Sequence, residues 1–565
     1  MFEGIDTIDW ANLETSFGAA TDVPRLLRSA AAEETKVREA ALEQLEVMLY
    51  HEGERFPATP RAIPFLFDLA LAPGTPARAR ILKMVMHFVG GACNFRDGLS
   101  LADGQRTIFA GKERDPQTPK EAQAVHIWRT CYNATRVFVP RVQELAFNGA
   151  EDVRVAASLL LGCYRTERRD IVPHLQDCFE HENIARVRAA QTFALGMLTH
   201  LNLDSAEFLV FIAKNDPAPL VRVVSSMVLA HAGAEAQKHT IVDALIEGLA
   251  LCHGWLGIEY RRLPFGTEGL CGDIGRTLTR LPNQQTRSAL PFLLDIFEHT
   301  EDAALIGVVR GILHAALGEC AESPADARRI RACKAALLYN ESVWQTAAIT
   351  RLLEEWGLPS DRDAFGASIA LSPESLAEGL HAFREGVDHA SAEQYEQALS
   401  NFQRAAALLP HKRNVACNVV WNLKVLGRTA EGLAEVERAL AVFDRSAHLH
   451  FEHGHLLVQK NEFVEGVDAC TRGLQLDAAD ARTRELSREA TELTPYGHYI
   501  RASAYARMGN PDKAVDDLRM AATLNRDFVN AMSDDVDFES LRSRADFQTL
   551  LSTASREDTP TVPMR

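Results

Sequence analysis

The sequence lacks an excess of positive charge and a long apolar run. Its 60 Lys and Arg residues are outnumbered by 77 Asp and Glu residues, which gives a formal net charge of -17. Proteins that bind phosphate backbones usually carry a basic face, so we do not expect nucleic acid as the main partner. No uncharged apolar run reaches the length of about 18 residues that a membrane-spanning helix needs, so we expect no membrane association.

Targeting and cysteine patterns are also absent. Residues 1–10 carry Glu3, Asp6 and Asp9 and lack the basic and apolar regions of a signal peptide, so we expect a cytoplasmic protein. The 10 cysteines form no C-x-x-C pair and no zinc-like spacing. We therefore expect reduced core cysteines, with no metal and no other cofactor.

Aromatic residues are scarce at 7%, whereas Ala and Leu recur throughout, and this balance favours helices. A single hydrophobic core stops growing near about 250–300 residues. A chain of 565 residues therefore requires several domains or an extended repeat array.

One segment repeats in the middle of the chain at a spacing of 34 residues, as VRVAASLLLG at 153–162, VRAAQTFALG at 187–196 and VRVVSSMVLA at 221–230. The repeats align the arginines Arg154, Arg188 and Arg222. Six residues before each arginine stands a side chain with an acceptor oxygen, at Asn148, Glu182 and Asp216. We expect this acceptor to cap the second helix of its unit or to bond the repeated arginine of a neighbouring unit.

Each repeated segment follows another amphipathic run, at 140–147, 171–179 and 206–213, so each unit is predicted to be a helical hairpin. A single hairpin cannot bury its apolar face alone, so neighbouring hairpins should stack into a solenoid. Weaker copies occur at 37–45, 305–318, 326–339 and 343–356.

This pattern resembles the HEAT-repeat family. The N-terminal stretch is similar to a group of bacterial HEAT-repeat proteins, in a motif formed here by Trp10, Leu13, Phe17, Gly18, Ala20, Asp22, Val23 and Pro24. The motif continues with His51, Glu52, Gly53, Phe56, Ala58 and Thr59. The resemblance covers most of residues 8–362 and implies a bacterial helical-repeat protein.

A second pattern begins near residue 379. Small residues at close helix contacts, a large apolar residue and a terminal proline are typical of a tetratricopeptide (TPR) unit, and here they are Gly386, Ala398, Phe402, Ala405 and Pro410. Three further units follow, and an insertion around 478–494 shifts the last of them. The sequence therefore resembles the TPR family in this region.

Together these patterns predict an all-α fold that is a double α-solenoid. We expect a HEAT-like domain at 1–357, a junction at 358–376 and a TPR-like domain at 377–550 that ends in a capping helix. Residues 551–565 are expected to be a disordered tail.

The TPR resemblance implies which side chains line a ligand groove, because the first helix of each unit presents fixed positions to it. The principal groove residues are then Phe383, Trp421, Lys424, His448, Phe451, His455, Tyr496, Tyr499 and Arg507. Exposed aromatics are suited to binding a peptide or a helix. The alternative is that the HEAT-like array or the chain's own tail fills this groove. A chaperone-type carboxylate clamp needs Lys and Asn at two positions of the first unit. Phe383 and Val387 occupy those positions here, so such a clamp is not supported.

Candidate metal chemistry is weak in this sequence. His448, His450, His453 and His455 form a histidine run, but helical geometry places only two of them on the same side. The HEAT-type iron hydroxylases carry His-Glu pairs in symmetric repeats. Here the two such pairs begin at His51 and His181, and the positions 34 residues from His181 are not histidine. We expect no metal site and no catalytic residue.

Two stretches interrupt the repeat rhythm, at 89–120 and 253–275, and both are rich in glycine. Long loops in a solenoid often have a function. In the second stretch the candidate contact residues are Trp255, Tyr260, Arg261 and Arg262. Turn and hinge roles are one reading of both stretches, and an insert that contacts a partner is the other.

The sequence favours a non-enzymatic protein-interaction scaffold, or a regulatory or immunity-type binder, that uses concave solenoid surfaces. Its acidic charge would complement a basic protein or peptide. The alternatives are an enzyme or enzyme subunit with its site at 253–275, and a HEAT-like DNA-binding protein.

Overall fold

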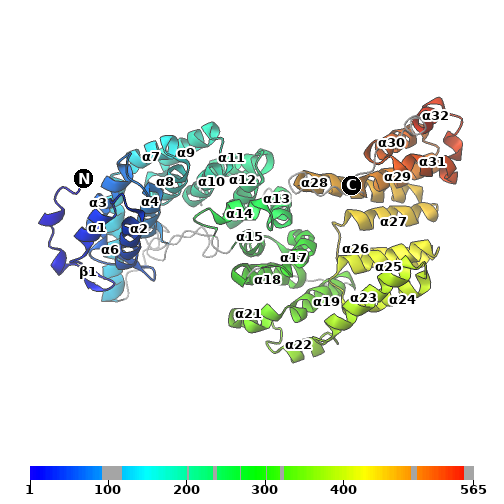
Figure 1. Ribbon diagram of the computed structural model, residues 1–565, viewed down its shortest axis with the longest axis horizontal. Helices are drawn as coiled ribbons and strands as arrows, with labels where there is room; N and C mark the ends of the chain where they lie inside the picture. The colour runs from blue at the N-terminus through cyan, green and yellow to red at the C-terminus, as the bar shows by residue number, and fades with distance from the viewer. Residues whose placement is uncertain are drawn as a thin grey trace, which may run out of the picture. The chain divides into compact units, whose positions relative to one another are not determined.

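The computed structural model describes residues 1–91, 118–199, 203–232, 238–266, 269–300, 302–318, 324–484 and 493–552. Helices dominate these residues, and the only strands among them are four two-residue strands, so the all-α prediction is confirmed (Figure 1). Most of the stretch at 89–120 and nearly all of the tail predicted at 551–565 lie outside the described residues.

The chain divides into two compact units, Met1–Gln285 and Thr286–Arg565. In both, helices follow one another as packed pairs, which is the α-solenoid arrangement. The division concerns packing, whereas the boundaries at 357 and 377 concern repeat type and stay predictions.

Unit 1 begins with short helices and two β-hairpins. The helical elements here are η1 (Ile5–Thr7), η2 (Trp10–Asn12), α1 (Val23–Ser29), α2 (Thr35–Leu49), α3 (Thr59–Leu71) and α4 (Arg78–Gly90). The remaining helices of the unit are α6 (Pro119–Arg136), α7 (Val139–Asn148), α8 (Glu151–Gly162), η3 (Arg165–Glu167), α9 (Arg168–His181), α10 (Ala185–Thr199), α11 (Leu203–Asn215), α12 (Pro219–His231), α13 (Lys238–Leu251), α14 (Trp255–Arg261) and α15 (Leu270–Leu278).

The predicted hairpins at 140–230 are the pairs α7–α8, α9–α10 and α11–α12. The repeated segments form the second helices, which pack on one another because small residues recur where they meet. A Cβ atom on Gly162 would lie 3.0 Å from Ala194 Cα, so α8 and α10 approach closely only because position 162 is glycine.

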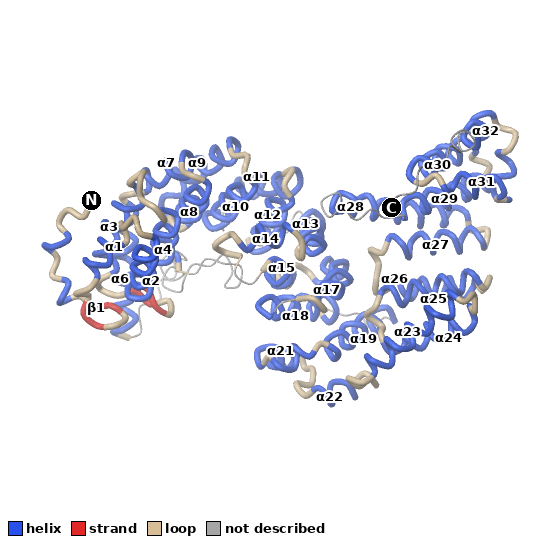
Figure 2. Tube along the Cα trace, viewed as in Figure 1, coloured by secondary structure: helices blue, strands red, loops and turns tan. Residues whose placement is uncertain are grey.

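The two β-hairpins were not predicted from the sequence. Strand β1 (Glu14–Thr15) pairs with β2 (Gly18–Ala19), and β3 (Tyr50–His51) pairs with β4 (Glu54–Arg55), both antiparallel (Figure 2). Glu52 and Gly53 connect the second pair with φ angles of 50° and 86°. Two successive positive φ angles define the type I′ turn that suits a two-residue hairpin loop, which explains the Glu-Gly dipeptide in the N-terminal motif.

Unit 2 begins with irregular helices and continues with regular pairs. The first part comprises η5 (Arg287–Ala289), α17 (Leu290–Phe297), α18 (Asp302–Leu317), α19 (Pro324–Tyr339), α20 (Glu341–Gln345), α21 (Ala347–Glu355) and α22 (Arg362–Ala367), and α16 (Asn283–Thr286) spans the division. The pairs are α23 (Ser375–Ser391) with α24 (Tyr395–Leu408), α25 (Arg413–Val425) with α26 (Thr429–Leu440), α27 (Ala447–Gln459) with α28 (Phe463–Arg484), and α29 (Leu493–Arg507) with α30 (Pro511–Leu524). The chain then forms α31 (Asp527–Asp534), η6 (Val536–Leu541) and α32 (Ala545–Ser552).

Small residues bring the paired helices of unit 2 together, as the sequence predicted. A Cβ atom on Gly386 of α23 would lie 2.7 Å from the ring of Phe402 on α24. At the far end, Phe538, Leu541 and Phe547 are buried in the same cluster as residues of α29 and α30, so η6 and α32 cover the last pair.

Candidate binding surfaces

The predicted groove residues lie on the first helices of the four pairs, α23, α25, α27 and α29. We call the face formed by these positions the ligand face. Seven of its nine principal residues are not buried, and two are buried. Arg507 is exposed, and six are partly exposed, namely Phe383, Trp421, Lys424, His448, His455 and Tyr496.

The two buried residues require a correction. Phe451 is 0% exposed, and Tyr499 is 9% exposed. The ring of Phe451 packs against Gly473 of α28 and Gly497 of α29, where a Cβ atom would clash with it. Tyr499 donates a 2.5 Å hydrogen bond to Asp535 and packs edge-on against Phe538. Both side chains therefore belong to the core, and the prediction that they contact a ligand is wrong.

The exposed apolar part of the ligand face lies on the first two pairs. Val387 on α23 and Val425 on α25 are each 41% exposed. Phe383 and Trp421 stand four residues before these valines, so each helix presents one aromatic and one valine on the same side. We call these four residues the apolar patch. Trp421 is held edge-on by Tyr395, with ring centroids 5.9 Å apart.

A polar cluster joins α25, α27 and α29, and we call it the Lys424 cluster. Lys424 Nζ lies 2.7 Å from the buried carboxylate of Glu452 and donates a 3.1 Å hydrogen bond to the Tyr496 hydroxyl. His455 Nδ1 is 2.9 Å from the same hydroxyl. Tyr496, Lys424 and His455 were each predicted as ligand contacts, but the sequence did not predict that they meet at the Tyr496 hydroxyl.

The Lys424 cluster shifts the pKa values of its members. Burial alone would raise the pKa of Glu452, but the hydrogen bond from His448 and the charge of Lys424 outweigh it and lower the pKa. Burial, together with the charge of Lys424, lowers the pKa of His455 to about 4. The cluster therefore holds a charged carboxylate, a lysine and a neutral His455 at neutral pH.

His448 has the opposite environment to His455. A hydrogen bond with Cys417 and an ion pair with Glu452 raise the pKa of His448 to about 9. Thiol, imidazole and carboxylate in this order resemble the components of a nucleophilic site, but Cys417 is only 7% exposed. The burial of the thiol favours a packing role for Cys417.

The other residues of the histidine run point elsewhere. His450 Nε2 lies 2.9 Å from the Asp444 carbonyl oxygen, on a different side from the bond that His455 makes to Tyr496. Within the described part of the chain, no group of three or more His, Cys, Asp or Glu side chains is arranged to hold a metal ion.

The stretch at 253–275 is largely helical and not the loop that its glycines suggested. It contains α14 and most of α15, and the Tyr260 hydroxyl donates a 2.7 Å hydrogen bond to Asp273 within the core. Tyr260 is fully buried, so its prediction as a contact residue is wrong. Trp255 and Ile258 are 37% and 52% exposed on the outer side of α14, and Arg261 and Arg262 are exposed beside them.

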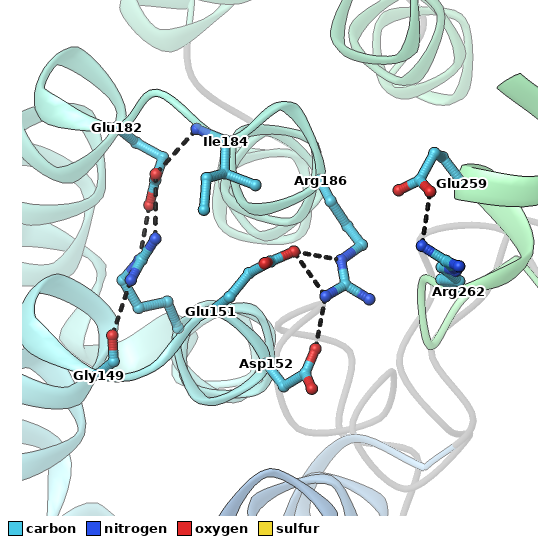
Figure 3. Close-up of polar contacts among 9 residues, drawn as sticks. Gly149, Glu151, Asp152, Glu182, Ile184, Arg186, Glu259 and Arg262 are labelled. Atoms are coloured by element: carbon cyan, nitrogen blue, oxygen red, sulfur yellow. Dashed lines mark hydrogen bonds and ion pairs between the residues drawn. The ribbon is translucent and has the colours of Figure 1, made fainter. Parts of the chain in front are cut away.

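The repeated arginines of unit 1 form a ladder between neighbouring pairs. Arg154 Nε donates to Glu182 at 2.7 Å, Arg188 pairs with Asp216, and Arg222 pairs with Glu247 on α13. Glu182 thus accepts from Arg154, and Figure 3 shows its bond to the backbone nitrogen of Ile184.

The acceptors of the first two rungs, Glu182 and Asp216, have a second role. A carboxylate oxygen of Glu182 accepts from the backbone nitrogens of Asn183 and Ile184 at 3.0 Å, and Asp216 accepts from the backbone nitrogen of Ala218 at 2.9 Å. Both roles that the sequence left open are therefore filled, since the acceptors hold the turn before the second helix and bind the arginine of the preceding unit.

A second set of ion pairs lies beside the ladder. Arg186 donates to Glu151 and Asp152 of α8, both at 2.6 Å (Figure 3). Arg262, one of the predicted contact residues, pairs with Glu259 at 2.7 Å. The bonds of Arg186 link the successive second helices α8 and α10, and the sequence did not predict them because the other repeats have no arginine at this position.

No single helix in the described ranges is long and apolar enough to cross a membrane. One bent pair, Thr240–Leu251 with Trp255–Arg261, passes that test by length and composition, with a bend of 102°.

Comparisons with known proteins add little to these observations. No protein-family model and no curated protein matches the chain. A crystal structure of the APC/C hetero-tetramer Cut9-Hcn1 is 12% identical, with a TM-score of 0.26, over 77% of this chain and 96% of that chain. A structure from work on a phosphorylation switch that controls the interaction between cadherin and beta-catenin is 10% identical, with a TM-score of 0.27, over 94% and 99%. Scores this low give no information on function.

Proposed function

We propose that this chain is a non-enzymatic scaffold that binds a protein partner on the ligand face of its C-terminal repeats. The exposure of the apolar patch carries the proposal. Phe383 and Val387 on one helix and Trp421 and Val425 on the next place two aromatic and two branched side chains on neighbouring first helices. Aromatic anchors with apolar neighbours are typical of the centre of a protein interface.

The Lys424 cluster supports the same proposal. It begins at the residue next to Val425 and extends to α29, so a polar region borders the apolar patch. Its side chains are held by bonds to one another, and groups that are already ordered lose little entropy when a partner binds. A fixed polar border would orient a partner whose apolar side chains occupy the patch.

The proposal extends to the kind of protein. We place this chain among bacterial proteins with HEAT-like repeats followed by TPR-like repeats, acting in the cytoplasm to hold or neutralise another protein. The formal charge of -17 favours a basic partner, because opposite charges speed association and discriminate against acidic competitors.

Affinity capture with a matched pair of variants tests the proposal. Val425→Asp places a charge in the apolar patch, whereas Val464→Asp makes the same change at an exposed valine on the second helix α28. A specific partner should be captured by the wild-type chain and by Val464→Asp, and lost with Val425→Asp. Equal capture by the two variants would refute binding at the ligand face.

A second contact surface is favoured by α14. Trp255 and Ile258 are three residues apart and exposed on a short helix that interrupts the repeats, and tryptophan is enriched among residues that dominate binding energy. Trp255→Ala should weaken capture without changing helicity. If Trp255→Ala changes helicity and capture is otherwise the same, α14 has a structural role only.

A further inference from the structure

A cavity of about 440 Å³ lies within unit 2, and its lining includes none of the ligand-face residues named above. Arg328 and Arg331 of α19 line one part of it, and the other lining residues lie on α24, α25 and α26 or in the turns that follow α24 and α26. The helix α25 belongs to both surfaces, since Ala416 and Val419 line the cavity while other residues of α25 belong to the ligand face. A volume of this size is within the usual range for a bound ligand, about 300–1,000 Å³.

The charged lining of the cavity is mostly basic, in a chain that is acidic overall. Four cations, Arg328, Arg331, Lys412 and Arg438, face one carboxylate, Glu435. Arg438 pairs with Glu435 at 2.6 Å, and Lys412 pairs with Glu298. The charge of Arg328 also acts on Glu435, so Arg328 and Arg438 share one carboxylate, and the lining keeps an excess of positive charge beside α19.

The two α19 arginines can act together. Arg328 and Arg331 are three residues apart on one helix, so they share a helix face. Arg331 Nη2 donates one hydrogen bond, of 3.2 Å, to the Ala407 carbonyl oxygen, and this bond anchors the guanidinium at the cavity wall. A guanidinium has five N–H donors, so one bond does not exhaust its capacity to bind a ligand. Both arginine residues are exposed.

The floor of the cavity is apolar. Leu409, Val419 and Phe443 line it and are almost fully buried, and Pro410 lies beside them. A ligand that fits must therefore combine negative charge toward α19 with an apolar group toward α24 and α26.

We propose that this cavity binds an acidic peptide segment of a protein partner, with a carboxylate on Arg328 and Arg331 and an apolar side chain on the floor. Arginine and carboxylate form strong paired hydrogen bonds. A nucleic acid fits poorly, because only a few cations are present and the net charge of -17 repels a polyanion. The inference rests on the proposed scaffold function and adds a second, acidic element to its partner.

Fluorescence anisotropy with a labelled octapeptide of alternating glutamate and leucine tests this assignment on the full chain. We expect saturable binding, at least tenfold weaker for Arg328→Glu and for a peptide with glutamine in place of glutamate. Arg351→Glu, the same change at an exposed arginine on α21, should bind as the wild type does. Unchanged binding by Arg328→Glu, or equal binding of the glutamine peptide, would overturn the proposal.

Two further arms separate the possible failures. Free glutamate that displaces the peptide at equal concentration would mark a small-carboxylate site and overturn the peptide assignment. Val425→Asp should leave peptide binding intact, and a loss there would place the peptide on the ligand face instead of the cavity. Partner capture that depends on Val425, with no peptide binding, would overturn the cavity proposal while the scaffold proposal stands.

Discussion

The arginine ladder of unit 1 and the Lys424 cluster of unit 2 use the same spacing for different purposes. Arg154 reaches Glu182, Arg188 reaches Asp216 and Lys424 reaches Glu452, and each partner lies 28 residues further along the chain, in the next helix pair. In the ladder this contact recurs, and the carboxylates of Glu182 and Asp216 also bind backbone nitrogens just before or at helix starts. In the cluster it occurs once and recruits Tyr496 and His455 from two helices.

This difference separates a structural device from a locally adapted one. A rung that repeats with the helix pairs sets the register of the solenoid wherever it occurs. A contact that occurs once, beside exposed apolar side chains and with histidines of shifted pKa, depends on the particular residues around it. The ladder should therefore respond to substitution through stability alone, and the cluster through stability and pH.

The largest effect is expected from Phe451→Ala. The ring fills the space between α27, α28 and α29 and supports Tyr496 of the cluster, with ring centroids 6.5 Å apart. Removing a buried phenylalanine side chain costs about 3–5 kcal/mol. Thermal unfolding of unit 2 should move to lower temperature, whereas Phe17→Ala, at an exposed phenylalanine of unit 1, should leave the melting curve unchanged. A melting temperature near that of the wild type would show that Phe451 is not a core residue.

The next effect tests the ladder. Asp216→Ala removes the partner of Arg188 and the acceptor for the Ala218 nitrogen, and breaking a buried pair of this kind costs about 3 kcal/mol. Amide hydrogen exchange in α10 and α12 should quicken. Asp152→Ala, at an exposed carboxylate that pairs with Arg186, should cost under about 0.5 kcal/mol. Similar exchange in the two variants would argue against a special role for the ladder.

Double variants sharpen the comparison. Lys424→Met leaves the Glu452 carboxylate buried without its cation, at a cost of about 2–3 kcal/mol, and adding Glu452→Leu should recover most of it. In the ladder, Arg188→Met with Asp216→Leu should recover less, because the bond to Ala218 is lost as well. Unfolding in urea, followed separately for the two units by hydrogen exchange, measures both. Equal recovery would mean that the backbone bond adds nothing to the rung.

The smallest effect is a pH dependence confined to the cluster. The lowered pKa of His455, about 4, means that the folded chain disfavours the protonated ring that the unfolded chain accepts below about 6.5. Stability should therefore fall as pH drops from about 6.5 toward 4. The melting-temperature advantage of the wild type over His455→Gln should shrink by about 2–4 °C between pH 7 and pH 5. A constant difference would show that His455 titrates normally.

The sequence predicted the ladder because its residues recur at a fixed interval. The spacing offered a bond between Arg188 and Asp216 as one of two roles for the acceptor, and the helix pairs around them followed from the same period. The glycine positions of the C-terminal pairs were predictable for a similar reason, since Gly386 must be small where Phe402 crosses it.

The ligand face was harder to predict because it departs from regular repetition. The fixed TPR positions assume equal spacing, but α28 continues to Arg484 and α29 begins only at Leu493, and in this arrangement Gly497 packs on Phe451. Phe451, at a position assumed to line the groove, therefore lies in the core. Tyr260 was misplaced because its glycine-rich surroundings suggested a loop, whereas the glycines permit close packing, as where Gly266 lies against the Tyr260 backbone. The charged cavity beside α19 joins segments far apart in sequence, so no local pattern indicates it.

Hydrogen exchange of the full chain with and without its captured protein partner tests the scaffold account most directly. The account predicts slower exchange at amides of α23 and α25, which carry Val387 and Val425, and loss of that protection with Val425→Asp. Protection that is absent from both helices, or that persists unchanged in Val425→Asp, would contradict it.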